Sequence, residues 1–181
     1  MDPLAQGSGQ AVRQGRLSRF CERLLASWPP LPRLLLGGLL WGALMALSGL
    51  VSLYSATALI GFNVKSVILL YFAGGLIGWF AGLPFASFAA HGHRPETRFC
   101  AFFLFLSVAT VAITAFFFAL DYRLYYAQWH APFATRTWLF QFVFTTLGAA
   151  YQFAVIGMRH YFPLGLTALV IASFYLARRV R

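Results

Sequence analysis

Charged side chains are scarce in this sequence, and acidic ones are the scarcest. Asp and Glu together number four, beside 14 Lys and Arg residues, and charged residues make up 10% of the 181, against about 25% in soluble domains. Hydrophobic residues make up 60%, and the mean hydropathy is +0.72. A surface of this composition cannot face water on all sides, which excludes an ordinary soluble enzyme. The chain is therefore predicted to be an integral membrane protein.

Motifs for catalysis and metal binding are also lacking. No GxSxG, HExxH, P-loop or GxGxxG pattern occurs. The two cysteines, Cys21 and Cys100, have no CxxC spacing. A haem would need two histidines on facing helices at similar depth, and none of the four histidines lies deep in an apolar run. We therefore predict no catalytic residue, no cofactor and no metal site.

The net charge of +10 would suggest nucleic acid as a partner of a soluble protein. Here 13 of the 14 cations are arginines, and they lie at the ends of apolar runs. Cations at such positions set membrane topology and contact anionic headgroups. Membrane lipids, and not nucleic acid, are the expected partners of these arginines.

Apolar runs divide the rest of the chain into segments. A helix needs about 20 apolar residues to cross a hydrocarbon core of about 30 Å, and other backbone would leave amides unpaired in lipid. The sequence predicts an all-α polytopic membrane helix bundle with four full transmembrane helices plus a short fifth segment, preceded by an amphipathic surface helix. The predicted segments are residues 34–54, 66–89, 99–120, 138–158 and 161–177.

Residues 1–32 are predicted to form a basic tail and an interfacial amphipathic helix. Between Ala11 and Trp28, apolar residues alternate with four arginines, a pattern typical of a helix that lies on anionic headgroups. Prolines at positions 29, 30 and 32 should end that helix. Residues 33–181 then form a single transmembrane bundle domain.

The distribution of Lys and Arg indicates the orientation. With a cytoplasmic N-terminus and five crossings, the inside holds eight cations (Arg13, Arg16, Arg19, Arg23, Arg33, Arg94, Arg98, Arg159) and the outside six (Lys65, Arg123, Arg136, Arg178, Arg179, Arg181). If the fifth segment does not cross, the last three arginines return inside, and the count becomes eleven against three. We expect a bacterial inner membrane protein with its N-terminus in the cytoplasm.

Small residues spaced four apart mark candidate packing faces. In lipid, glycines let helix backbones approach closely. Packing within the chain is favoured over contact with a partner subunit. The residues concerned are Gly38 and Gly42 in the first segment and Gly74, Gly78 and Gly82 in the second.

A polar and aromatic cluster follows the third segment. Tyr and Trp at a helix end commonly anchor it at the headgroup level, with Asp121 neutralised by Arg123 or Arg136. If the helix continued beyond Leu120, the cluster could instead bind a proton, an ion or a polar headgroup. The cluster, predicted to lie outside the cell, comprises Asp121, Arg123, Tyr125, Tyr126, Gln128, Trp129 and His130.

Gln141, Thr145 and Gln152 lie near one stripe of the fourth segment. Such residues usually form hydrogen bonds between helices, and a substrate path is the alternative. No charged residue lies in the middle of any crossing, although proton- and ion-coupled carriers generally need one.

These features favour an accessory or assembly subunit of a larger inner-membrane protein complex, which binds other membrane subunits by helix packing and lipid contact. One alternative is a small homo-oligomeric transporter or channel. A second is a membrane enzyme acting on a lipid-linked substrate. Its only plausible catalytic side chains would be Asp121, His130, Arg159 and His160.

Overall fold

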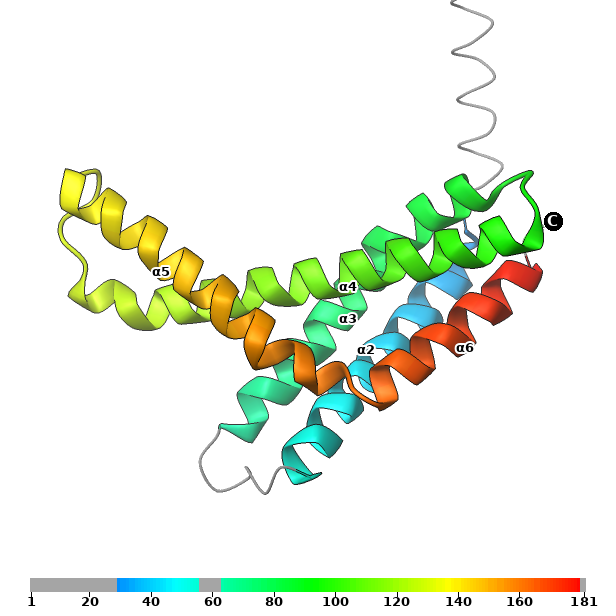
Figure 1. The fold of residues 1–181 in the computed structure, drawn as a ribbon, viewed down its shortest axis with the longest axis horizontal. Coiled ribbons are helices and arrows are strands. Elements are labelled where there is room, and N and C mark those ends of the chain that lie inside the picture. Colours follow the sequence, from blue (N-terminus) through cyan, green and yellow to red (C-terminus); the bar gives the residue numbers. More distant parts are fainter. Residues whose placement is uncertain (1–28, 56–62, 180–181) are drawn as a thin grey trace, which may run out of the picture.

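The computed structural model describes residues 29–55 and 63–179, and all of their regular elements are helices (Figure 1). They are α2 (Leu31–Ser55), α3 (Val64–Ala90), α4 (Pro95–Tyr126), α5 (Arg136–Val155) and α6 (Leu164–Arg179). Two 3-10 helices, η2 (Ala127–Trp129) and η3 (Gly157–Tyr161), follow α4 and α5.

Within the described residues, four stretches are long and apolar enough to cross a membrane: Leu31–Ser55, Val64–Ala90, Pro95–Trp129 and Arg136–Tyr161. Helix α6, with 16 residues, is the short fifth segment. The predicted all-α membrane bundle is therefore confirmed. The predicted surface helix lies outside the described residues.

Local sequence signals explain where several helices begin. Pro95 occupies the first turn of α4, where its missing N–H costs nothing. Gly92, in the turn before it, has a φ of +75°, a conformation that glycine adopts without strain. The hydroxyl of Thr135 accepts a hydrogen bond from the Trp138 amide and caps α5.

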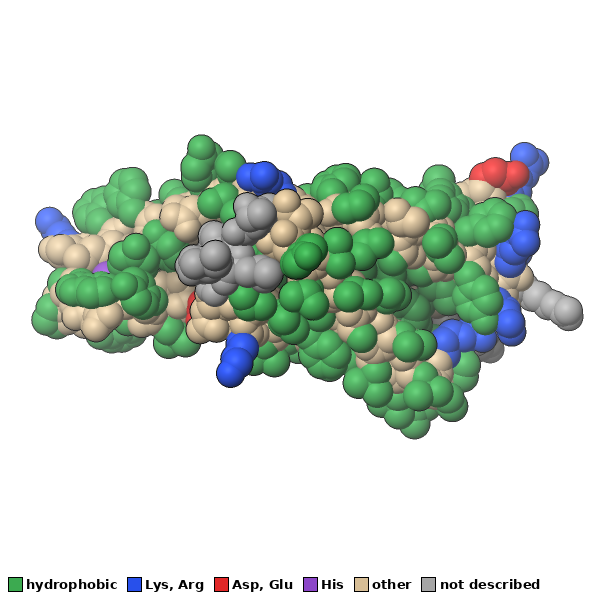
Figure 2. All heavy atoms as spheres, turned by 90° about the horizontal axis from the view of Figure 1, so that it is seen from below, with side chains coloured by type: hydrophobic (Ala, Val, Ile, Leu, Met, Phe, Trp, Pro, Cys, Tyr) green, Lys and Arg blue, Asp and Glu red, His purple; other side chains and the backbone are tan. Residues whose placement is uncertain are grey.

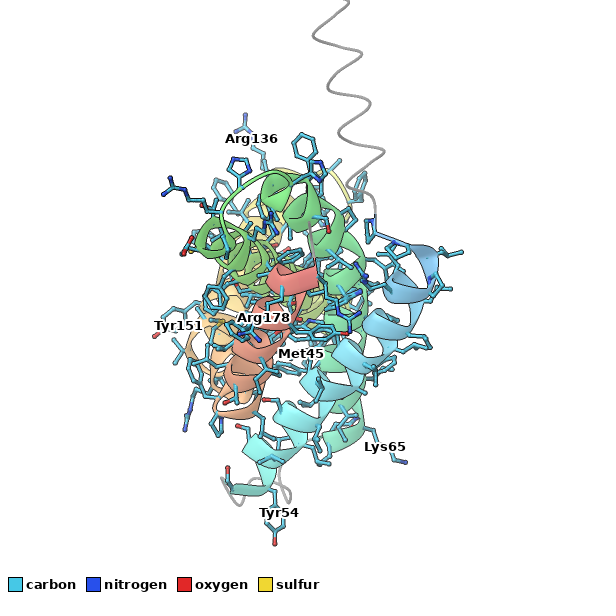
Figure 3. All side chains as sticks on the ribbon, turned by 90° about the vertical axis from the view of Figure 1, so that its right-hand side faces the viewer. Met45, Tyr54, Lys65, Arg136, Tyr151 and Arg178 are labelled. Carbon is cyan, nitrogen blue, oxygen red and sulfur yellow. The ribbon has the colours of Figure 1, made fainter. Side chains whose placement is uncertain are left out.

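Helices α2, α3, α6 and the first part of α4 form a bundle with two distinct ends. The first end holds the start of α2, the end of α3, the start of α4 and the end of α6 (Figure 1). Helices α4 and α6 lie side by side there, and residues of Pro95–Cys100 and Phe174–Arg178 line one shared pocket. The second end holds Ser55 and Val64, and Figure 3 shows Tyr54 and Lys65 projecting from it.

Helix α6 runs from the second end of the bundle back to the first. Its second residue, Gly165, donates a backbone hydrogen bond to Ser48 near the end of α2, and its last turns lie beside the start of α2. Arg178 and Arg179 therefore lie at the same end as the α3–α4 turn. Five alternating crossings would place them at the opposite end. Their position matches the count in which the C-terminal arginines lie on the same side as the N-terminus, but the reason differs from the expected one. Helix α6 runs along the bundle, and it is α5 that stops before the first end.

His160 also differs from the five-crossing expectation. Its ring nitrogen Nδ1 lies 3.1 Å from the Ser52 hydroxyl, so it belongs to the second end, away from His91 and His93. The reason is that α5 stops at Val155 and η3 folds onto α2 before the chain reaches the first end.

Helix α4 is longer than the predicted segment. Residues 99–120 were expected to form it, but the helix continues to Tyr126. Asp121 and Arg123 mark the end of the apolar run and not the end of the helix. Arg123 in the last turn is favourable because it complements the negative end of the helix dipole.

The part of the chain beyond this point forms an arm. We define the α4–α5 arm as residues 121–152, which project sideways from the bundle as a helical hairpin (Figure 1). In the space-filling view, hydrophobic side chains cover most of the visible arm and bundle (Figure 2). Lys and Arg side chains lie at both ends of the molecule and at its edges partway along its length (Figure 2).

Candidate functional site: a buried polar junction and an apolar arm

Helix η3 joins the arm to the bundle through hydrogen bonds with α2 and α3. The Ser48 hydroxyl donates to the His160 carbonyl at 2.7 Å and accepts from the Gly165 amide at 3.0 Å. The Tyr71 hydroxyl donates to the Gly157 carbonyl at 2.6 Å. Backbone groups that leave the helical pattern at η3 thus find side-chain partners, as buried amides and carbonyls must.

A second chain of hydrogen bonds links η3 to α4 and α2. The Tyr161 hydroxyl donates to the Thr114 hydroxyl at 2.8 Å, which in turn donates to the Thr110 carbonyl at 2.7 Å. The Trp41 indole N–H donates to the Thr110 hydroxyl at 3.0 Å. We call these two sets, together with Ser52, the polar junction: Trp41, Ser48, Ser52, Tyr71, Thr110, Thr114, Gly157, His160, Tyr161 and Gly165.

His160 is the group in the junction that can titrate near neutral pH. Its ring is half-buried and meets the Tyr71 ring edge-on, with centroids 5.5 Å apart. No carboxylate accompanies it, because the acidic residues in the described part are Glu96, at the first end, and Asp121, on α4 beside Ser66–Leu70. The junction is therefore equipped to hold η3 in place and lacks an acid–base pair.

The side chains considered for a lipid-linked enzyme are not brought together. His160 belongs to the junction, whereas His130 follows η2 at the tip of the arm. Arg159 is exposed, and Asp121 lines a pocket of about 300 Å³ between α3 and α4. No shared site arises from these four positions.

The glycines of the two candidate packing faces, which we call the glycine stripes of α2 and α3, lie against neighbouring helices of the same chain. A Cβ added to Gly42 would lie 2.8 Å from the Phe72 carbonyl of α3, and one at Gly38 would lie 3.1 Å from the Phe80 ring. At Gly78 it would lie 2.6 Å from Thr110 Cα of α4, and at Gly82 2.8 Å from the Phe105 carbonyl.

Gly74 is the tightest of these positions. A Cβ there would overlap the Thr114 side chain and lie 2.9 Å from Thr114 Cα. The stripe on α3 thus brings the backbone of α4 close enough for Thr110 and Thr114 to reach the polar junction.

The outer cluster forms an aromatic ladder on the arm. Tyr126 contacts Tyr122, with centroids 4.6 Å apart, and Trp129, at 5.8 Å. Tyr125 contacts Trp129 at 5.4 Å, and its carbonyl accepts a hydrogen bond from Gln128. The ladder lies on helical backbone, not on the loop suggested by the apolar boundary.

Arg123 finds a different neighbour from the expected Asp121. Its guanidinium lies over the Phe142 ring of α5, 4.0 Å from the centroid, a favourable cation–π geometry. Asp121 is exposed and points to the α3 side of α4.

The three polar residues of α5 that the sequence places near one stripe have partners inside the arm. The Gln141 side-chain oxygen accepts from the Ala131 amide at 2.8 Å, and Gln152 donates to the Tyr122 hydroxyl at 3.4 Å. The Thr145 hydroxyl donates to the Gln141 carbonyl one turn earlier. The Gln152 bond ties α5 to α4, the Gln141 bond ties it to the segment that follows η2, and the Thr145 bond lies within α5.

Sequence reasoning missed most of the polar junction. A usable signal was present: Ser48 and Ser52 are four apart on α2, as Thr110 and Thr114 are on α4. Polar pairs at that spacing share one face of an otherwise apolar helix. Their partners could not be read from sequence, because Ser48 and Gly165 are 117 residues apart.

Within the described residues no group of three or more His, Cys, Asp or Glu side chains could hold a metal ion. Comparison with known proteins identifies no relative: no family model, curated protein or solved structure matches the chain.

Proposed function

We propose that the protein is an accessory or assembly subunit of a larger inner-membrane protein complex, and that it binds its partner subunits through the α4–α5 arm. The supporting observation is the exposure of α5. In the most apolar window of the Arg136–Tyr161 span, 11% of the residues are buried, against 44% in α2 and 39% in α3.

The charged residues at the base of the arm favour protein over lipid as its cover. The uncharged run of α4, residues 99–120, is about 33 Å long at 1.5 Å per residue and alone matches a core of about 30 Å. The arm begins where this run ends, at Asp121. Figure 1 shows the arm diverging from the rest of the bundle, so a hydrocarbon layer that covered the arm would also have to cover the charged residues at its base, Asp121 and Arg123.

Large apolar side chains line the arm. Contiguous exposed apolar surface of this kind marks an interaction site. The exposed residues are Leu124, Phe133, Leu139, Phe140, Val143, Phe144, Leu147 and Tyr151.

The homo-oligomeric transporter is the weaker proposal. Its path would need the polar side chains of α5, and Gln141, Thr145 and Gln152 already have partners within the arm.

We propose the bacterial inner membrane as the location, with the first end of the bundle in the cytoplasm. Four arginines precede α2 in the sequence, and Arg33, Arg94, Arg98, Arg178 and Arg179 lie at that end. This concentration of cations follows the positive-inside rule.

Site-specific photocrosslinking in cells tests the proposed function. A photoreactive residue at Phe144, which is 69% exposed on α5, should crosslink to one defined membrane protein. The matched control at Leu39, which is 52% exposed on α2, should yield no protein adduct. Adducts of Phe144 only with further copies of this chain would favour the homo-oligomer, and equal adducts at both positions would refute a role specific to the arm.

A further inference from the structure

A groove on the outside of the bundle, at the first end, lies between α2 and α6. It has a volume of about 410 Å³, and Trp79 of α3 forms its floor. The walls are apolar: Leu36, Leu40 and Leu44 on α2, and Ala172, Tyr175 and Leu176 on α6. Leu36 and Leu40 are 64% and 66% exposed, so the groove opens toward the surroundings of the bundle.

An unpartnered hydrogen-bond donor lies in this apolar groove. Trp79 is 6% exposed, and its indole Nε1 is buried with no hydrogen-bond partner. The indole edge lies against Gly37, which also lines the groove, and Nε1 would be 2.9 Å from a Cβ at that position.

The neighbouring tryptophan shows that the fold can satisfy such a donor. The rings of Trp41 and Trp79 are 5.8 Å apart, and the Trp41 indole donates to Thr110. Because buried donors are nearly always paired, the indole of Trp79 indicates an occupant that carries a hydrogen-bond acceptor.

The mouth of the groove is cationic. Arg33 is the charged residue in its lining, and no acidic side chain of the described part lines it. Arg179 lies over the ring of Tyr175, a wall residue, with its guanidinium carbon 4.9 Å from the centroid. The first end of the bundle, which faces the viewer in Figure 3, also carries Arg178.

The spacing of charge and donor fits a particular ligand class. Arg33 and Gly37 are four residues apart on α2, which is a rise of about 6 Å. In a glycerophospholipid, the phosphate and the acyl ester carbonyls are separated on the same scale, and the acyl chains continue beyond the esters.

We propose that this groove binds one anionic glycerophospholipid. The phosphate lies at Arg33, near the wall where Arg179 covers Tyr175. An ester carbonyl enters the groove floor beside Gly37, uncovers the indole edge of Trp79 and accepts the hydrogen bond of its Nε1, and one acyl chain follows Leu36, Leu40 and Leu44. The proposal is independent of the arm and of the proposed partner subunits.

Native mass spectrometry of the full chain in mild detergent tests the proposal. The protein would be incubated with equal amounts of phosphatidylglycerol and phosphatidylcholine. We expect the unaltered chain to retain a single phosphatidylglycerol in preference to phosphatidylcholine. Trp79→Phe, which removes the N–H and keeps a ring, should lower retention of both lipids about two- to tenfold, the range for one hydrogen bond.

Arg33→Gln should act differently, because it removes charge and leaves the ester contact. We expect it to lower retention of phosphatidylglycerol more than that of phosphatidylcholine, whose choline cation already offsets the phosphate charge, so that the preference for phosphatidylglycerol falls. The matched controls are Trp129→Phe and Arg136→Gln on the arm, which should leave retention unchanged. Circular dichroism and gel filtration would establish that each variant is folded.

Three results would overturn the proposal. One is unchanged retention in both Trp79→Phe and Arg33→Gln, and another is an equal loss in the arm controls. The third is the absence of any retained lipid in the unaltered chain, which would favour a protein segment as the occupant.

Discussion

Replacement of Gly78 tests how closely α3 and α4 must approach. A Cβ at this position would lie 2.6 Å from Thr110 Cα, 2.9 Å from its hydroxyl and 3.0 Å from its amide nitrogen. Two of these atoms belong to the backbone, so a rotamer change cannot relieve the contact. Ordinary contacts begin at 3.4 Å, so the helices must separate by about 0.8 Å in the Gly78→Ala variant.

The separation has two costs. Overpacking of a tight interface costs about 1 to 3 kcal/mol. The Thr110 hydroxyl would also move away from the Trp41 indole, its donor at 3.0 Å, and loss of a buried hydrogen bond costs about 1 to 3 kcal/mol. The two costs add to about 2 to 6 kcal/mol, and the helix propensity of Ala offsets about 0.5 to 1 kcal/mol of this, so we expect Gly78→Ala to lower the free energy of unfolding by about 1 to 5 kcal/mol.

Gly148 provides the matched control. It also lies within a helix, but a Cβ there would meet no atom within 4 Å. Gly148→Ala should therefore raise stability by about 0.5 to 1 kcal/mol, the helix-propensity difference. Unfolding in mixed detergent micelles, followed by circular dichroism, measures both variants. Equal stability of the two would refute the inference that the α3 stripe sets the helix separation.

Three further outcomes are expected. Ser48→Ala should cost about 1 to 3 kcal/mol in the same unfolding assay, because the Gly165 amide loses its acceptor; an unchanged midpoint would show that water or another group replaces the hydroxyl. Asp121→Asn should change the free energy of unfolding by less than about 1 kcal/mol, as for exposed charges, and a large loss of stability in this variant would indicate that the carboxylate binds a ligand or a partner. Joint replacement of Tyr126 and Trp129 by Ala should disturb the arm more, which faster proteolysis between α4 and α5 would measure. In a chain without Cys21 and Cys100, single cysteines at Thr97 and Arg179 should react with an impermeant reagent from the same side and one at Thr135 from the other, and labelling of Arg179 and Thr135 together would contradict the position of α6.

The crossings could be predicted because lipid imposes a simple rule. Apolar runs of sufficient length must be helical, and the described helices fall on the predicted segments. Boundaries were less predictable where charge and helix end do not coincide. Asp121 ends the apolar run, yet the helix continues for five more residues to Tyr126.

The polar junction could not be predicted because its bonds join distant parts of the chain. Thr110 and Thr114 interrupt the apolar run of residues 99–120, and each could have bonded within its own helix. Only the close approach permitted by Gly74 and Gly78 brings them to Tyr161 and Trp41.

The same limit applies to what covers the apolar surface. Leu39 and Phe144 are both large, apolar and more than half exposed, and hydropathy treats them alike. Their positions relative to charge distinguish them. Leu39 is on α2, within the bundle, whereas Phe144 belongs to an arm that starts at Asp121 and carries Arg123 at its base. Lipid around the bundle can cover Leu39. At Phe144, a hydrocarbon layer would also have to cover the charged residues Asp121 and Arg123. Contact with a partner protein avoids the cost of placing these charges in lipid. We therefore expect a partner on the arm and not on the equally apolar face of α2.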